Sequence, residues 1–335
     1  GICPVAYQMS ACAAVEDALG VAITEEVRAL RRLLYCGEWI ESHVLHMVML
    51  HAPDFLDVPD VVGLAKLHPE RVKAALRIKK AGNAIVATLG GREIHPINVR
   101  IGGFYRAPRR DELTALLAEL TWARGAALEM LDWMAGFPFP EAEHDYLFVA
   151  LRHPSQYPMN EGRIVSSAGL DIEPREYDSA FAESQERRTH ALHTTHRGKT
   201  MLCGPLARLS LNFDRLPAIA REAAGRVGIG PVCRNPWKSL LVRGIEVVAA
   251  FDEAIRLIEG YSPPALPSLQ PAMRAGTGYG CTEAPRGLLY HRYALRDDGI
   301  VADAKIVPPT SQNQRVIEED LFRMGRALAS LPKEE

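Results

Sequence analysis

The sequence lacks several features that would assign it to a class at once. Its 335 residues contain no apolar run of about 18 residues or more, so we expect no membrane-spanning segment. A net charge of −2 leaves no basic field for binding nucleic acid. The chain has no initial Met and no signal-like apolar stretch, and Gly1 as first residue suits a fragment or a processed chain. It also has no P-loop, no G-x-G-x-x-G and no G-x-S-x-G motif, so any nicotinamide chemistry would reside on a partner.

Cysteine is present, but never as a C-x-x-C pair. The scatter of the six cysteines argues against a disulfide scaffold, and five of them are expected to be buried apolar side chains: Cys12, Cys36, Cys203, Cys233 and Cys281. Cys3 is the exception, because it directly precedes Pro4 at the start of a predicted helix. The positive helix end is expected to lower the pKa of the Cys3 thiol and to favour the thiolate, a soft ligand that suits nickel and iron.

The hydrophobic pattern predicts a mainly α chain with a β minority. Apolar residues recur at helical spacing in segments with capping and stop signals at their ends. Seven helices are predicted, over residues 4–19, 24–51, 69–89, 110–135, 216–227, 237–259 and 314–331. Long amphipathic helices with short links favour a multihelical bundle core.

The predicted strands are fewer and shorter. They cover residues 146–151, 288–295 and 300–307, and Asp297-Asp298-Gly299 predicts a hairpin between the last two. The polar, turn-rich middle of the chain, residues 144–205, is expected to form a small α/β layer on the bundle. No convincing linker divides the chain, so we expect a single domain over residues 1–335.

Two segments near the C-terminus could carry chemistry. In the stretch GTGYGCTEAPRG, Arg286 lies between Pro285, which fixes φ, and Gly287, which permits a tight turn. A cation carried on such stiff backbone is well positioned. The segment IVPPTSQN follows the predicted hairpin and contains Thr310, whose hydroxyl can donate a hydrogen bond to an anion.

These two segments and the opening GICPVAYQMS resemble the large (alpha) subunit of [NiFe] hydrogenases, and the wording resembles the cytoplasmic, NAD(P)-linked group also called sulfhydrogenases. That family opens its metal site with Arg-x-Cys-Gly-x-Cys, and this chain begins at the Gly of that motif. The family closes the site with a second Cys-x-x-Cys, which this chain lacks. The resemblance therefore implies the hydrogenase large-subunit fold in a chain truncated at both ends.

The resemblance also implies roles for individual residues. Cys3 matches the thiolate that bridges nickel and iron, and Tyr7 stands where the family often has a His that supports this thiolate. Arg286 matches the catalytic arginine above the metals, with Pro285 beside it. The residues of the IVPPTSQN segment match contacts to an iron-bound cyanide and a backbone carbonyl that binds Mg²⁺; these are Pro309 and Thr310 for the cyanide and Ile306 for the Mg²⁺. We expect Cys3, Arg286 and Thr310 to line one buried pocket.

Several histidines have metal-like spacing. His95 lies in a segment similar to the family's His-Pro-x-x-x-x-x-Gly-Gly and is expected to support the metal site from behind its ligands or to lie at an interface. His43 and His46 share a helix face that could bind zinc, but no third ligand accompanies them, so a core or relay role is preferred. A last group is expected on a solvated loop or helix face: His190, His193 and His196.

The function implied by the resemblance is reversible oxidation of H₂ at a Ni–Fe centre with CO and CN ligands, supported by Mg²⁺. Electrons would pass first to an iron–sulfur small subunit. They would then reach diaphorase-type subunits that carry Fe–S clusters, flavin and NAD(P), in the cytoplasm. Because Cys3 alone matches a metal ligand, the 335-residue chain by itself is expected to bind no Ni–Fe centre and to be inactive.

Two alternatives remain. One is a non-catalytic, hydrogenase-like scaffold. The other is the quinone-site subunit of respiratory complex I, which has a similar Glu-x-Pro-[Arg/Lys]-Gly segment but lacks the metal cysteines. The presence of Cys3 and of the PPTSQN run argues against this second alternative.

Overall fold

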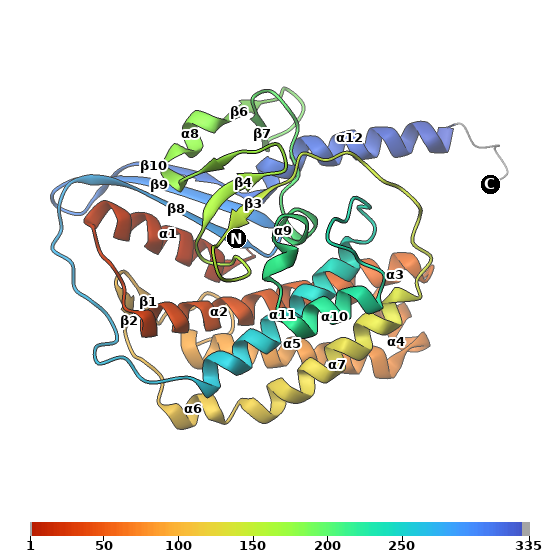
Figure 1. The fold of residues 1–335 in the computed structure, drawn as a ribbon, viewed down its shortest axis with the longest axis horizontal. Helices are drawn as coiled ribbons and strands as arrows, with labels where there is room; N and C mark the ends of the chain where they lie inside the picture. Colours follow the sequence, from red (N-terminus) through yellow and green to blue (C-terminus); the bar gives the residue numbers. More distant parts are fainter. Residues whose placement is uncertain (1, 330–335) are drawn as a thin grey trace.

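The computed structural model describes residues 2–329. Most of its helices form a lower layer and its main sheet lies in an upper one with α8 (Tyr177–Ala180) and α12 (Pro309–Ala329), while the N-terminal helix lies between them (Figure 1). With 51% of the residues in helices and 16% in strands, the chain is mainly α with a β minority, as the sequence predicts. No helix within residues 2–329 is long and apolar enough to cross a bilayer.

The helical layer is built on four long helices. They are α2 (Glu25–Val44), α5 (Pro69–Gly90), α7 (Leu117–Ala135) and α11 (Ser239–Glu259). The start of α2 is capped by Thr24, whose Oγ1 accepts a hydrogen bond from the backbone N–H of Val27 at 3.4 Å. Apolar side chains such as Trp39, Leu131 and Phe251 are fully buried where these helices meet.

Shorter helices complete this layer. They are α3 (Ala52–Phe55), α4 (Val61–Leu67), α6 (Arg110–Thr114), α9 (Pro205–Asn212) and α10 (Ala218–Arg226), with a 3₁₀ turn over Phe213–Arg215. A short hairpin, β1 (Val99–Arg100) and β2 (Gly103–Phe104), lies beside α2.

The main sheet is antiparallel, in the order β10–β9–β8. Its strands are β8 (Gly276–Ala284), β9 (Gly287–Leu295) and β10 (Val301–Val307), and α12 (Pro309–Ala329) follows directly. Two smaller sheets lie near it and come from the middle of the chain. The first consists of β3 (Val149–Arg152), β4 (Arg163–Ser166) and β5 (Asp171–Ile172), and the second of β6 (Phe181–Gln185) and β7 (Leu192–His196). A 3₁₀ turn over Pro174–Glu176 and the short helix α8 (Tyr177–Ala180) connect β5 to β6.

Helix α1 (Pro4–Leu19) packs against β8, although most of the chain separates the two. Glycine at alternate positions of β8 makes this close approach possible. A Cβ at Gly276 would lie 2.7 Å from the carbonyl oxygen of Ala18, and a Cβ at Gly278 would overlap the backbone of Ala14 and Ala18. The glycine-rich stretch is therefore a strand shaped to receive a helix.

Three helix boundaries differ from the sequence prediction. The helix predicted over 110–135 is divided into α6 and α7. The second predicted helix continues to His51 but ends as a π-helix over Leu45–His51, and Pro53 lies in the first turn of α3, where its missing N–H costs nothing. Helix α12 begins at Pro309 rather than at 314, because proline is also favoured in the first turn of a helix.

The prediction of a solvated segment around His193 is wrong. Strand β7 buries both His193 and His196, because this strand pairs with β6 and lies beneath α12. His193 Nε2 lies 3.0 Å from Glu318 Oε1, and His196 Nδ1 lies 2.9 Å from the carbonyl oxygen of Ala180. The prediction for the cysteines is confirmed, since all six are buried and free.

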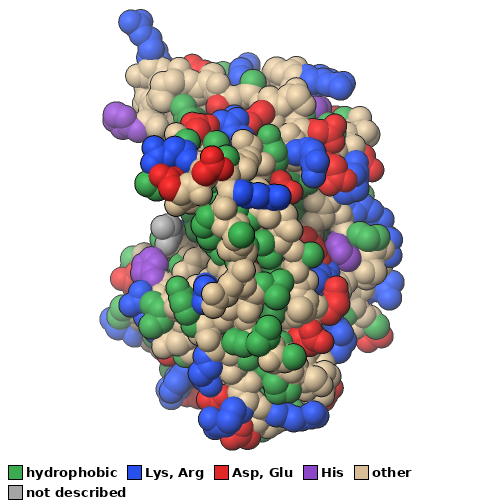
Figure 2. Space-filling view, turned by 90° about the vertical axis from the view of Figure 1, so that its left-hand side faces the viewer, with side chains coloured by type: hydrophobic (Ala, Val, Ile, Leu, Met, Phe, Trp, Pro, Cys, Tyr) green, Lys and Arg blue, Asp and Glu red, His purple; other side chains and the backbone are tan. Residues whose placement is uncertain are grey.

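Charges of both signs are interspersed on the face that lies at the left of Figure 1 and is turned toward the viewer in Figure 2. Lys and Arg side chains there alternate with Asp and Glu rather than forming a patch of one sign. This face provides no basic stripe of the kind that binds nucleic acid.

Candidate functional site

The two ends of the chain meet at Cys3 and Arg286. Arg286 Nη2 donates a hydrogen bond to Cys3 Sγ at 3.0 Å, across 283 residues of sequence. Cys3 is the buried N-cap residue of α1, and Arg286 is the second residue of the two-residue turn between β8 and β9. The expectation that these segments meet is confirmed.

The turn that carries Arg286 is held by close backbone packing. Gly287 has a φ of +139°, and a Cβ there would lie 2.9 Å from the Cβ of Cys203. Asn313 on α12 links the two segments, because its Oδ1 accepts from the Cys203 N–H at 2.8 Å and its Nδ2 donates to the Arg286 carbonyl at 3.4 Å. The Arg286 backbone is therefore fixed on two sides.

The N-terminus of α1 is occupied by Glu38 of α2. Its two carboxylate oxygens accept hydrogen bonds from the backbone N–H groups of Val5 at 2.6 Å and Ala6 at 2.9 Å. Burial raises the pKa of Glu38 to about 8, although these two hydrogen bonds oppose the rise.

This arrangement makes the expected low pKa of Cys3 wrong. Burial raises the pKa of the Cys3 thiol to about 11, the nearby Glu38 carboxylate raises it further, and Arg286 opposes both effects. The helix N–H groups that were expected to favour a thiolate are instead bonded to Glu38.

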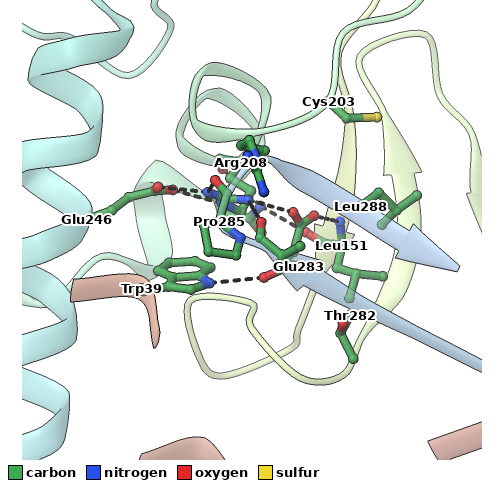
Figure 3. Close-up of polar contacts among 12 residues, drawn as sticks. Trp39, Leu151, Cys203, Arg208, Glu246, Thr282, Glu283, Pro285 and Leu288 are labelled. Atoms are coloured by element: carbon green, nitrogen blue, oxygen red, sulfur yellow. Dashed lines mark hydrogen bonds and ion pairs between the residues drawn. The ribbon is translucent and has the colours of Figure 1, made fainter. Parts of the chain in front are cut away.

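Behind the Arg286 turn lies a buried charge network centred on Arg208 (Figure 3). Arg208 Nε and Nη2 donate to the two carboxylate oxygens of Glu246 at 2.9 and 2.8 Å, and Nη1 donates to Glu283 at 2.9 Å. The same guanidinium donates to the carbonyl oxygens of Ala284 and Pro285, both at 2.8 Å. One arginine thus joins α9, α11 and the turn that positions Arg286.

Further contacts complete this network. Trp39 Nε1 donates to the Glu283 carbonyl at 3.0 Å, and the Leu151 N–H donates to Glu283 Oε1 at 2.7 Å (Figure 3). Burial alone would raise the pKa of Glu246, but the charge and hydrogen bonds of Arg208 hold it well below its usual range. Burial raises the pKa of Glu283 to about 7 despite the same arginine.

His43 belongs to this network rather than to a metal site. Its Nε2 lies 2.9 Å from Glu246 Oε2, and burial lowers its pKa to about 4, so the ring is neutral at pH 7. Within residues 2–329, no three His, Cys, Asp or Glu side chains are grouped so that they could hold a metal ion.

The remaining predicted residues are dispersed. Tyr7, one turn after Cys3, packs edge-to-face on His291 with ring centres 5.5 Å apart. His95 is exposed in the loop between α5 and β1. Pro309 is buried at the start of α12, whereas Thr310 is exposed and Ile306 on β10 is 43% exposed.

The expected single buried pocket is therefore wrong with respect to Thr310, because α12 begins at Pro309 and its first turn directs Thr310 to the surface. Sequence reasoning also missed Glu38, Arg208 and Glu246. Arg208 had a signal, since it is a lone charge among the apolar residues of GPLARL, and such a charge needs a buried partner.

A binuclear metal centre fits these residues only in part. Cys3 supplies one buried thiol beside a cation, and the other five cysteines lie elsewhere in the core. Residues 2–329 thus offer one thiol to such a centre and no complete ligand set.

The sequence is similar to those of known proteins. The profile of the nickel-dependent hydrogenase family matches residues 1–73. The alpha chain of sulfhydrogenase 2 from Pyrococcus furiosus is 31% identical over 343 residues, which cover 100% of this chain and 79% of that protein. A vhu subunit of the F420-non-reducing hydrogenase from Methanococcus voltae is 26% identical, covering 98% of this chain and 84% of that protein.

Solved structures agree on the fold. An NAD⁺-reducing [NiFe]-hydrogenase in the H₂-reduced state superposes with a TM-score of 0.85 at 24% identity, over 95% of this chain and 77% of that one. The Ni-Fe-Se hydrogenase from Desulfomicrobium baculatum gives a TM-score of 0.75 at 19% identity, over 93% of this chain and 78% of that one.

The fold is that of the large subunit of a hydrogenase, and hydrogenases are oxidoreductases. The chain belongs to the nickel-dependent hydrogenase family, and it is similar to the alpha subunit of a sulfhydrogenase of that family.

Proposed function

We propose that this protein is the catalytic subunit of a [NiFe] hydrogenase that interconverts H₂ with protons and electrons. The observation that carries the proposal is the contact between Arg286 Nη2 and Cys3 Sγ at 3.0 Å. A thiol that ligates metal and a cation that acts above it must be neighbours, and the fold brings them together from opposite ends of the chain. Residues 1–335 are taken as a single domain in this proposal.

In the proposed site Cys3 is a metal ligand and Arg286 is the catalytic residue. When bound, a Ni–Fe centre with CO and CN ligands would supply the redox chemistry. Arg286 holds a donor over the sulfur and supplies positive charge there, while Arg208 and Gly287 fix the turn that carries it. In the same proposal Tyr7 and Pro285 lie in the surrounding shell.

The other ligand contacts are also proposed. Pro309 would face a cyanide ligand, and the backbone carbonyl of Ile306 would bind Mg²⁺, whereas the exposed Thr310 is left out of the proposed site. These assignments rest on the position of the IVPPTSQN segment, which leads into α12. Its Asn313 side chain donates a hydrogen bond to the Arg286 carbonyl oxygen and so holds the segment beside the Arg286 turn. His43 and His95 are assigned supporting positions, and the network contact of His43 with Glu246 is consistent with that role.

Electrons are proposed to leave through an iron–sulfur small subunit. From there they reach flavin and NAD(P) on diaphorase-type subunits in the cytoplasm. The NAD⁺-reducing enzyme with the same fold and the sulfhydrogenase relative support this choice of partners. Reduction of NAD(P)⁺ by H₂ in a complex purified through this chain would test it, and H₂ uptake with viologen dyes alone would contradict it.

The role of Arg286 is tested in a protein that also carries the remaining metal-binding motifs, taken from the Pyrococcus furiosus relative. Arg286→Lys replaces a rigid planar fork of donors by a mobile point charge. We expect it to keep its nickel but to lose H₂ turnover by about a hundredfold. Arg296→Lys, on the exposed β9–β10 turn, is the control and should retain full turnover.

Two outcomes separate the alternatives. Near-wild-type turnover in a nickel-replete Arg286→Lys protein would show that this residue only shapes a turn. A parent protein that folds with all its motifs but takes up no nickel would favour the non-catalytic scaffold.

A further inference from the structure

A second feature lies apart from Cys3 and Arg286. A cavity of about 320 Å³ opens at the surface between α2, α11 and the segments that follow β3 and α9. None of its lining residues takes part in the contact between Cys3 and Arg286. Its volume is at the lower end of the range for small-molecule sites, which suits a compact ligand rather than a dinucleotide or a peptide.

The lining carries an excess of positive charge. Three arginines, Arg32, Arg215 and Arg256, face a single carboxylate, that of Glu253, so the lining has a net charge of +2. Glu253 is already shared, because it accepts from Arg32 Nε at 2.5 Å and from Arg256 Nε and Nη2 at 3.0 and 2.8 Å. One carboxylate therefore cannot neutralise the third cation.

Arg215 is the cation that lacks a hydrogen-bond partner. Its Nε is buried and has none among the described residues. The neighbouring carboxylate of Asp214 lies 3.4 Å from that Nε, and it is engaged by Arg152, whose Nη1 and Nη2 donate to it at 3.1 and 2.9 Å. The Arg215 side chain is 33% exposed, so an oxyanion in the cavity would accept hydrogen bonds from its outer guanidinium nitrogens rather than from the buried Nε.

Charges of both signs lie just outside the lining. Arg28 lies next to the cavity, donates to Gln156 Oε1 at 3.1 Å and is paired with Glu161. Burial lowers the pKa of His153, and the charges of Arg28, Arg32 and Arg215 lower it further. The lining also contains both apolar and polar residues: Met159, Pro217 and Ala249 are apolar, and Ser155 and Gln156 are polar.

We propose that this cavity binds a small organic anion through a phosphate or carboxylate group. Arg215 and Arg256 donate to the oxyanion, since guanidinium forks match its geometry, and the apolar lining residues contact the body of the ligand. The proposal does not depend on the metal site, because the cavity is formed wholly by described residues of this chain.

The test is titration calorimetry on the 335-residue chain with phenyl phosphate, benzoate and the neutral benzyl alcohol. We expect saturable one-site binding of at least one anion and none of the alcohol, and the better anion identifies the head group. Arg215→Ala should weaken binding at least tenfold. Arg221→Ala, an exposed arginine on α10, is the matched control and should bind like the parent.

A second measurement locates the site without a variant. Phenylglyoxal modifies accessible arginines, and mass spectrometry of the labelled wild-type chain should show that the bound anion protects Arg215 but not Arg221. The proposal is overturned if neither anion binds, if both variants bind equally well, or if the anion leaves Arg215 labelling unchanged.

Discussion

At the scale of single residues, the arrangement is dominated by buried charges. Arg208 is fully buried and is the only guanidinium bonded to both Glu246 and Glu283 within residues 2–329. Its removal would leave two carboxylates in the core without the cation that is hydrogen-bonded to both. Such a group is costly because the low-dielectric interior does not solvate it.

Arg208→Met is therefore expected to destabilise the protein by about 3–5 kcal/mol. Arg226→Met is the matched control, because it breaks an ion pair with Asp132 that is about half exposed, and it should cost less than about 1 kcal/mol. Urea unfolding followed by circular dichroism measures both. Equal midpoints for the two variants would contradict the structural role of Arg208.

A second prediction concerns His291, which is buried beside Tyr7. Burial lowers its pKa from 6.5 to about 4, so the unfolded chain binds a proton that the folded chain does not. Its contribution is thus fully present above about pH 6.5 and is lost as the pH falls toward about 4.

Unfolding free energies measured between pH 7 and pH 4 should show this loss, on the order of 3 kcal/mol for this histidine. His291→Gln should flatten that part of the profile, whereas the same change at the exposed His95 should leave it unaltered. A profile that His291→Gln does not flatten would refute the assignment.

The sequence predicted the meeting of Cys3 and Arg286 but not the role of Glu38. Cys3 and Arg286 stand in local motifs, and their meeting followed from the resemblance. Glu38 stands in an ordinary amphipathic helix, and only the approach of α1 makes its carboxylate a cap. The raised pKa of Cys3 also depends on that tertiary contact.

At the scale of elements, the long helices were predictable, whereas β8 and the shorter helices α4 and α9 were not. Amphipathic periodicity identified α2, α5 and α11 nearly to their ends. Strand β8 has glycine at positions where strands usually carry β-branched or aromatic residues, so propensity argues against it. The alternation of its glycines is instead the trace of a helix backbone lying against one face.

Gly278→Ala tests that packing. The added Cβ would overlap the backbone of α1 at Ala14 and Ala18, and we expect a loss of about 1–3 kcal/mol or more. Gly225→Ala on α10 is the matched control, because nothing lies within 4 Å of its Cβ and helix propensity should stabilise it by up to about 1 kcal/mol. Thermal unfolding of the two variants should shift in opposite directions; a shared direction would contradict this account.

At the scale of the whole molecule, the described residues build the scaffold of a metal site without completing it. Within residues 2–329, Cys3 is the only cysteine whose sulfur is hydrogen-bonded to the Arg286 side chain. Purified residues 1–335 should therefore fold cooperatively yet contain no stoichiometric nickel and show no H₂ uptake. Elemental analysis and a viologen-linked assay measure both, and nickel at one atom per chain would contradict the expectation.

The pairing of α1 with β8 also orders events during synthesis. Helix α1 leaves the ribosome before β8, and the strand that covers its inner face is complete only when Ala284 has been made. At about 5–20 residues per second, that delay is on the order of tens of seconds. Throughout it the face of α1 that packs on β8 has no native partner, so Cys3 gains Arg286 as a neighbour only after β8 has been made.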